Sequence, residues 1–117
     1  MKLRAIRGAI QVGANTPEEI ESGVKELLPA ILQANGLNTD EVISVLLTCT
    51  KDLNAAFPAA FAREIGFGAV PLLCAVEMDV PGAMPLVIRV MLHAELPEAA
   101  NHVYLRGAAA LRKDLAQ

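Results

Sequence analysis

Hydrophobic positions follow two different spacings in the first third of this chain, and each spacing predicts one kind of element. Small and β-branched residues from Leu3 to Val12 predict a strand that contains Arg7. From Pro17 onward, apolar residues recur at the spacing of one helix face until Asn35 and Gly36 end the pattern. The N-terminal third therefore reads as a strand followed by an amphipathic helix.

The helix carries clear signals at its start and one conflicting residue inside. Thr16 can cap the first turn, Pro17 suits the first helical position, and Glu19 completes a capping box. Pro29 conflicts with the pattern, because an interior proline removes one hydrogen bond and clashes with the preceding turn. We therefore expect a kink or an early break at Pro29.

Three later apolar runs predict buried strands at residues 42–48, 69–76 and 86–93. Pro58 predicts a short helix that ends near Gly66. The C-terminal stretch HVYLRGAAALRKDL fits either a strand or a short helix. The order of elements predicts an α+β fold, a mixed β-sheet with helices on one face, as a single domain over residues 1–117.

The composition adds an expectation about assembly. Hydrophobic residues make up 54% of the 117 residues and charged residues 20%, with a mean hydropathy of +0.42. A domain of this size has a limited interior, so part of the apolar surplus is expected at a subunit interface. The sheet face away from the helices is the natural place for that interface.

Charge and cysteine usage exclude several functional classes. The net charge of −3 argues against nucleic acid, and no run reaches the roughly 18 apolar residues of a membrane span. Arg4 and Arg7 interrupt the apolar block that a signal peptide needs. Cys49 and Cys74 lack metal or redox spacing, so we expect free thiols in a cytoplasmic protein.

The usual catalytic signatures are missing from the sequence. His93 and His102 are not spaced as a metal pair, and no nucleophile elbow or phosphate-binding loop is present. Cys74 has no evident general base, and a buried cysteine usually behaves as a small hydrophobe. We therefore expect neither nucleophilic catalysis nor a metal site.

Two opposite charges stand out among apolar residues, Glu77 and Arg89. Arg89 has apolar neighbours on both sides, and a buried charge needs a partner, for which Glu77 is the obvious candidate. If their strands form a simple hairpin around Pro81 and Gly82, however, the two residues lie roughly 10 Å apart along the strands. This separation excludes a direct salt bridge and suits two groups that hold opposite ends of a small molecule.

Arginines at several apolar positions indicate an anionic ligand. A guanidinium binds carboxylates through two parallel hydrogen bonds, so carboxylates are the expected ligand groups. Tyr104 is the one tyrosine, and its hydroxyl either joins this site or is simply satisfied in the core. For any single arginine, an ordinary ion pair is the alternative. The arginines in question are Arg7, Arg63, Arg89 and Arg112.

In this order and spacing, the motifs resemble the trimeric, single-domain AroH-class chorismate mutases over nearly the whole chain. The matching pieces are RGAIQV from Arg7, DLNAAFPAAFARE from Asp52, VPLLCAVEMDVPG from Val70, IRV from Ile88, and finally HVYL and LRKDL. The resemblance implies a homotrimer with a pseudo-α/β barrel core and active sites at the subunit boundaries. It also implies conversion of chorismate to prephenate in phenylalanine and tyrosine biosynthesis, a Claisen rearrangement that uses no cofactor or metal.

The resemblance also implies roles for individual residues. Arg89 matches the arginine that binds the breaking ether oxygen, and Glu77 matches the carboxylate at the ring hydroxyl, with Cys74 beside it. Arg7 and Tyr104 match the pair that holds the side-chain carboxylate. The remaining matches are Phe57, Ala59 and Arg63 from the adjacent subunit, and Leu111 and Arg112 near the mouth of the site.

Two departures and two rival functions accompany this interpretation. The turn after Glu77, VPGAMP, is more proline-rich than the family pattern leads us to expect. Ala60 stands where relatives can carry a longer polar residue, which would weaken substrate capture at the rim. One rival is a non-catalytic trimeric module that binds a small carboxylate ligand at its interfaces. The other is a structural protein in which Glu77 and Arg89 merely pair across subunits. The combined set of Arg7, Glu77, Arg89 and Tyr104 favours the enzyme.

Overall fold

The computed structural model describes residues 1–112, and residues 113–117 lie outside the described part. The last residues of the LRKDL segment, Lys113 to Leu115, therefore have no described structure. The elements in chain order are β1 (Lys2–Gln11), α1 (Pro17–Ala34), η1 (Thr39–Glu41), β2 (Val42–Cys49), α2 (Pro58–Ala62), η2 (Arg63–Phe67), β3 (Leu72–Val76), β4 (Val87–Leu96), β5 (Val103–Leu105) and η3 (Arg106–Arg112).

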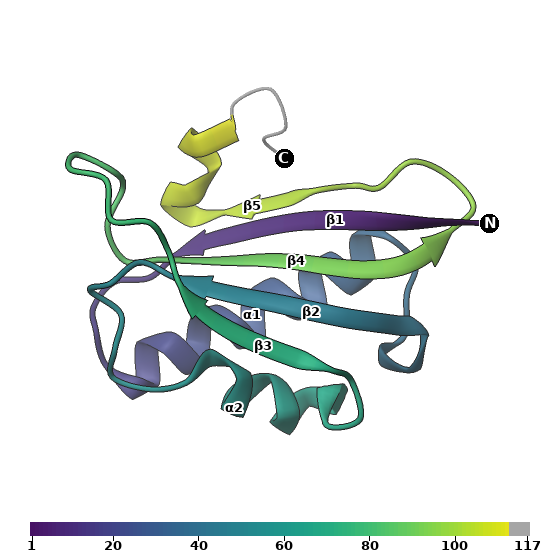
Figure 1. Cartoon of the computed structure of the whole chain (residues 1–117), viewed down its shortest axis with the longest axis horizontal. Coiled ribbons are helices and arrows are strands. Elements are labelled where there is room, and N and C mark those ends of the chain that lie inside the picture. Colours follow the sequence, from purple (N-terminus) through teal and green to yellow (C-terminus); the bar gives the residue numbers. More distant parts are fainter. Residues whose placement is uncertain (113–117) are drawn as a thin grey trace.

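The strands form one mixed sheet in the order β3-β2-β4-β1-β5. The three inner strands pair antiparallel, and the edge strands β3 and β5 run parallel to their neighbours. Helix α1 lies behind the sheet in Figure 1, and α2 lies beyond the β3 edge and contacts α1, so one face is covered and the other faces the viewer. The predicted α+β fold, with a mixed sheet and helices on one face, is confirmed.

Helix α1 begins as its sequence predicts. Thr16 Oγ1 accepts a hydrogen bond from the Glu19 backbone N–H at 3.1 Å, and Pro17 occupies the first turn. The expected early break at Pro29 is absent, because the helix continues to Ala34. Pro29 lies on the exposed face, where water can satisfy the carbonyl that lost its partner.

The core lies between α1 and the covered face of the sheet. Alternation along the strands sends one set of side chains inward, including Ile10, Leu47 and Ile88, and these pack against Val24 and Ile31 of the helix. All five are at most 1% exposed. The opposite set of strand residues is left on the open face, and this set contains Arg7 and Arg89.

The expected hairpin between residues 69–76 and 86–93 is wrong. Strand β3 pairs with β2 in parallel, and β4 pairs with the opposite edge of β2, so β2 separates the two strands. The chain from Glu77 to Leu86 crosses the end of the sheet instead of making a tight turn. A parallel β2–β3 pair was not readable from apolar runs, because every run looks equally buried.

The C-terminal ambiguity resolves into both alternatives in succession. Strand β5 adds a short parallel edge beside β1, with Tyr104 opposite Ala9. The helical segment η3 follows directly and packs over the open face near β1. Ala108 is fully buried in a small cluster with Ala9, Val87 and Tyr104, against which Leu111 also packs.

Candidate active site

The open face of the sheet gathers the charged residues by strand parity. Arg7 of β1 and Arg89 of β4 both point away from the helices, since their neighbours Ile6 and Ile88 are fully buried on the other side. Tyr104 of β5 shares this orientation through its pairing with Ala9. Three predicted site residues from three strands therefore reach the same face.

These residues line one cavity of about 330 Å³. Arg112 from η3 reaches the same cavity, whose other walls come from Gly8, Leu46, Thr48 and Met91. Three arginine side chains thus meet in a space of the size of a small organic ligand. Such an arrangement favours a ligand with more than one carboxylate.

Glu77 and Arg89 form a direct ion pair, with Arg89 Nε donating to Glu77 Oε1 at 3.0 Å. The expected separation of roughly 10 Å along the strands is therefore wrong. That expectation assumed a hairpin between their strands. In the structure, the long side chains of Glu77 and Arg89 reach toward each other across β2. Arg89 was also expected to be buried, yet 42% of its side chain is exposed, against 16% for Glu77.

Arg89 uses only part of its guanidinium in this pair. Among the described residues, its one side-chain hydrogen bond runs through Nε, so both terminal nitrogens remain for a ligand. A guanidinium presents its donors in a fixed fork, so one edge can hold Glu77 while the other binds an anion. The ion pair is therefore compatible with a binding role.

Thr48 is a residue of this site that the sequence reasoning missed. Its Oγ1 donates a hydrogen bond to Glu77 Oε2 at 2.8 Å, so each carboxylate oxygen of Glu77 has its own donor. Thr48 pairs with Arg89 on one side and Ala75 on the other. Only the strand order brings these residues together, and one threonine in an apolar run carries no such signal.

A second network fixes the start of β4. Both carboxylate oxygens of Asp52 accept from the backbone N–H of Leu86, at 3.2 and 3.1 Å, and Thr50 Oγ1 accepts from Val87. Leu86 has a φ of +57°, a conformation that a branched side chain rarely adopts. These bonds hold the chain where it enters the strand that carries Arg89.

Arg7 is tied to the C-terminal region through its backbone. Its N–H donates to His102 Nδ1 at 2.9 Å, just before β5. Burial, followed by the positive charges of Arg7 and Arg112, lowers the pKa of His102 below 6.5. The neutral imidazole therefore acts as a structural acceptor, and this bond joins β1 to the segment that carries Tyr104.

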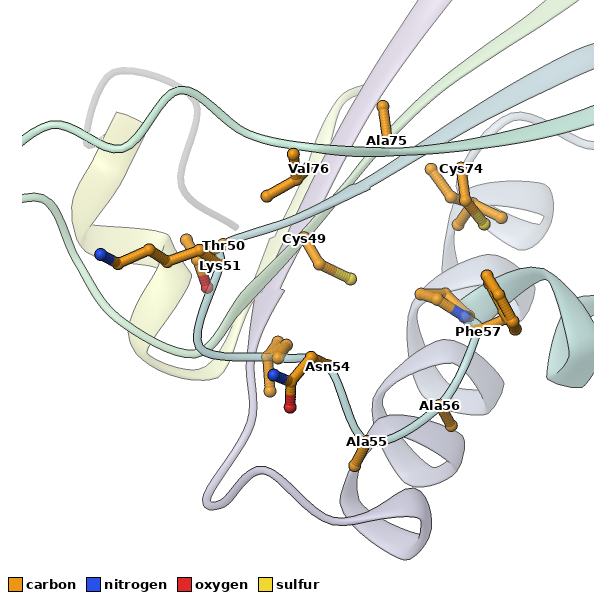
Figure 2. A pocket seen from close by; sticks show the side chains of 13 residues that line it. Cys49, Thr50, Lys51, Asn54, Ala55, Ala56, Phe57, Cys74, Ala75 and Val76 are labelled. Atoms are coloured by element: carbon orange, nitrogen blue, oxygen red, sulfur yellow. The ribbon is translucent and has the colours of Figure 1, made fainter.

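A second cavity of about 490 Å³ lies on the other side of the sheet, between β3 and the loop that leads to α2. Figure 2 shows Cys74 and Phe57 turned toward this space, while Ala75 points away from it. Cys74 therefore does not lie beside Glu77 in the same chain. The difference in parity between the two residues is real, and no bulge in β3 removes it.

The residues expected from an adjacent subunit cluster near this second cavity without entering the first. Phe57 is 74% exposed at its edge, and Arg63 is exposed on the following helical turn. Ala59 packs in the core beneath them with only 7% exposure. The structure of one chain therefore divides the predicted site residues into two groups.

The remaining chemistry of the described residues is limited. Burial raises the pKa of the Cys49 thiol to about 12, so it stays protonated at neutral pH. Within residues 1–112, no group of three or more His, Cys, Asp or Glu side chains is placed to hold a metal ion. None of the helices in this part of the chain is long and apolar enough to cross a membrane.

Comparisons with known proteins agree with the fold and with the motifs. Chorismate mutase AroH of Thermus thermophilus is 49% identical over 117 residues, covering 97% of this chain and 96% of the relative. Chorismate mutase AroH of Bacillus subtilis (strain 168) is 42% identical over 119 residues, covering 98% and 94%. The solved chorismate mutase from Clostridium thermocellum superposes with a TM-score of 0.88 at 44% identity, covering 92% of this chain and 98% of that one.

The family model described as chorismate mutase type I matches residues 3–115, which is nearly the whole sequence. The matched range includes both groups of site residues. This chain belongs to the chorismate mutase type I family.

Proposed function

We propose that the protein converts chorismate to prephenate in the open-face cavity, without a cofactor, a metal or a covalent intermediate. The observation that carries this proposal is the convergence of Arg7, Arg89 and Tyr104 beside Glu77 in one small cavity. Chorismate is a dianion, and the cavity presents arginines to a ligand of that charge. No nucleophile is needed, because the reaction breaks and forms its bonds within one molecule.

The mechanism follows from where the charges lie. In the rearrangement the C–O ether bond breaks as a C–C bond forms, so negative charge develops on the ether oxygen and positive charge on the ring. We assign the terminal nitrogens of Arg89 to the ether oxygen and the Glu77 carboxylate to the ring side. A preorganised donor of this kind typically contributes about 10²–10³ in rate, or about 3–4 kcal/mol.

The other residues orient the substrate. We assign Arg7 and Tyr104 to its side-chain carboxylate, with Arg112 and Leu111 near the mouth of the cavity. Holding the two reacting carbons close together lowers the barrier, because the bound substrate is already in the compact conformation that reacts. In the proposed assembly a second copy would cover this face and limit the access of water, so the charged groups would act in a medium of lower polarity than bulk solvent.

We further propose that the active unit is a homotrimer with sites at the subunit boundaries. Leu46, Leu73 and Met91 form an apolar row across the open face, and they are 40%, 62% and 38% exposed. A second copy would cover this row. It would also bring the exposed Phe57 and Arg63, with Ala59 and Cys74, against a cavity that one chain leaves incomplete.

The direct test is to mix purified protein with chorismate in the presence of a chelator and follow the loss of its ultraviolet absorbance. The proposal predicts turnover far above the uncatalysed rate, with prephenate as the product and no effect of the chelator. Tight binding of chorismate without turnover would instead indicate a carboxylate-binding module. If the protein neither bound chorismate nor turned it over, the proposed substrate would be wrong.

A further inference from the structure

Glu77 lies beyond the last residue of β3, so the strand alone does not fix its side chain. Its backbone N–H donates to the Cys49 carbonyl at 2.8 Å, and the chain then leaves the sheet. The next residue, Met78, is 86% exposed. The position of the Glu77 carboxylate therefore depends on the side chains that contact it.

Two donors from the sheet hold that carboxylate. Arg89 Nε binds Oε1 at 3.0 Å and Thr48 Oγ1 binds Oε2 at 2.8 Å. The two donors are register partners on adjacent strands, so their spacing is set by the β2–β4 pairing. Both bonds are charge-assisted, which makes them stronger than bonds between neutral groups.

The two donors differ in what else they must do. Arg89 is the group assigned to the substrate, and its side chain is 42% exposed. Thr48 has a short, β-branched side chain near the C-terminal end of β2, with few rotamers available to it. A stiff donor whose hydroxyl is already bound to Glu77 is suited to keep the carboxylate in place while Arg89 engages a ligand.

From this geometry we infer that Thr48 is a positioning residue for the reaction. It fixes the orientation of the Glu77 carboxylate through one hydroxyl hydrogen bond, and it acts on the reaction through Glu77, although it also lines the cavity. This inference rests on the proposed role of Glu77 in catalysis.

The test compares two substitutions at the same position. Thr48→Val keeps the shape of the side chain and removes the donor, whereas Thr48→Ser keeps the donor and removes one methyl group. We expect Thr48→Val to lower kcat by roughly tenfold or more with a much smaller change in KM, since a hydrogen bond to a charged group is lost. Thr48→Ser should retain kcat within about threefold of the wild-type protein.

Ser44→Ala provides a matched control on the same strand. Ser44 points to the same sheet face four residues earlier, and its hydroxyl lies 3.3 Å from His93 Nδ1, away from Glu77. Loss of this hydroxyl should leave kcat unchanged. Light scattering and thermal unfolding on each variant check that assembly and folding are retained.

A double substitution separates this inference from the proposed role of Glu77. Glu77→Gln alone should reduce kcat strongly, and adding Thr48→Val to it should cost little more, because the two residues act as one unit. Normal turnover in Glu77→Gln would overturn the role of Glu77 itself. An impaired Glu77→Gln with a fully active Thr48→Val, or a Thr48→Ser as slow as Thr48→Val, would overturn the inference on Thr48 alone.

Discussion

With the proposed roles, individual side chains in this site serve two partners at once, and Arg89 is the clearest case. Its Nε holds Glu77 at 3.0 Å, which places the guanidinium plane before any substrate arrives. The terminal nitrogens are then presented to the cavity in a fixed geometry. This is preorganisation at the scale of one residue, because little reordering is needed when negative charge develops on a ligand.

His102 gives a prediction on pH at the same scale. Its pKa is lowered in the folded protein, so the unfolded chain binds a proton more readily below about pH 6.5. Because burial and then the charges of Arg7 and Arg112 favour the neutral imidazole, His102 adds stability above that pH, and the contribution is lost as the pH falls through the lowered pKa. His102→Asn retains an acceptor near the Nδ1 position and does not titrate.

We therefore expect urea unfolding to show a smaller loss of stability for His102→Asn than for the wild-type protein between about pH 7 and about pH 5. Because the carboxylates titrate in both proteins, their contributions to the unfolding free energy cancel in the comparison. An equal loss of unfolding free energy in the two proteins would contradict the assigned role of His102.

The sequence predicted most of the helices and strands, but it did not predict which strands pair with each other. Cap and stop residues predicted the start of α1 at Pro17 and its end before Asn35, because these signals are local, whereas the early break expected at Pro29 was wrong. The pairing of β3 with β2 is non-local, and buried parallel and antiparallel strands have similar apolar runs. For this reason the sequence named Glu77 and Arg89 but misjudged their distance, and it missed Thr48 between them.

The contact between α1 and the sheet offers a prediction at the scale of elements. Gly23 lies where the helix touches the sheet, and an added Cβ would stand 2.6 Å from Val12 Cγ1 and 3.3 Å from Ile88 Cδ1. Gly23→Ala gains about 1 kcal/mol of helix propensity. Overpacking costs typically 1–3 kcal/mol, so we expect a net loss of about 1 kcal/mol in thermal or urea unfolding.

Gly68→Ala is the matched control for this substitution. Gly68 has a φ of −63°, and the nearest atom to an added Cβ is 4.0 Å away. The Gly68→Ala variant should have the same midpoint of thermal or urea unfolding as the wild-type protein, or a slightly higher one. If Gly23→Ala were as stable as Gly68→Ala, close packing at Gly23 would not be what joins the helix to the sheet.

The whole molecule is expected to be complete only as an assembly. The proposed trimer has a mass of three times 12.4 kDa, about 37 kDa, which light scattering measures directly. Leu73→Glu places a charge in the apolar row of the open face, so it should dissociate the trimer and abolish turnover together. As a control, Gln33→Glu adds the same charge on the exposed surface of α1, and it should leave both the trimer and turnover intact. A wild-type monomer with full activity would contradict the assembly.

In the proposed mechanism, the charges on the open face carry out the reaction in the intact assembly. The most direct measurement is kcat for chorismate in Arg89→Ala, with Lys25→Ala as control because Lys25 pairs with Glu21 and Glu64 on the helix layer. We predict that Arg89→Ala loses about 10²–10³ in kcat or more while its mass by light scattering is unchanged. Lys25→Ala should keep wild-type turnover. A folded, assembled Arg89→Ala protein with near-normal kcat would contradict the account.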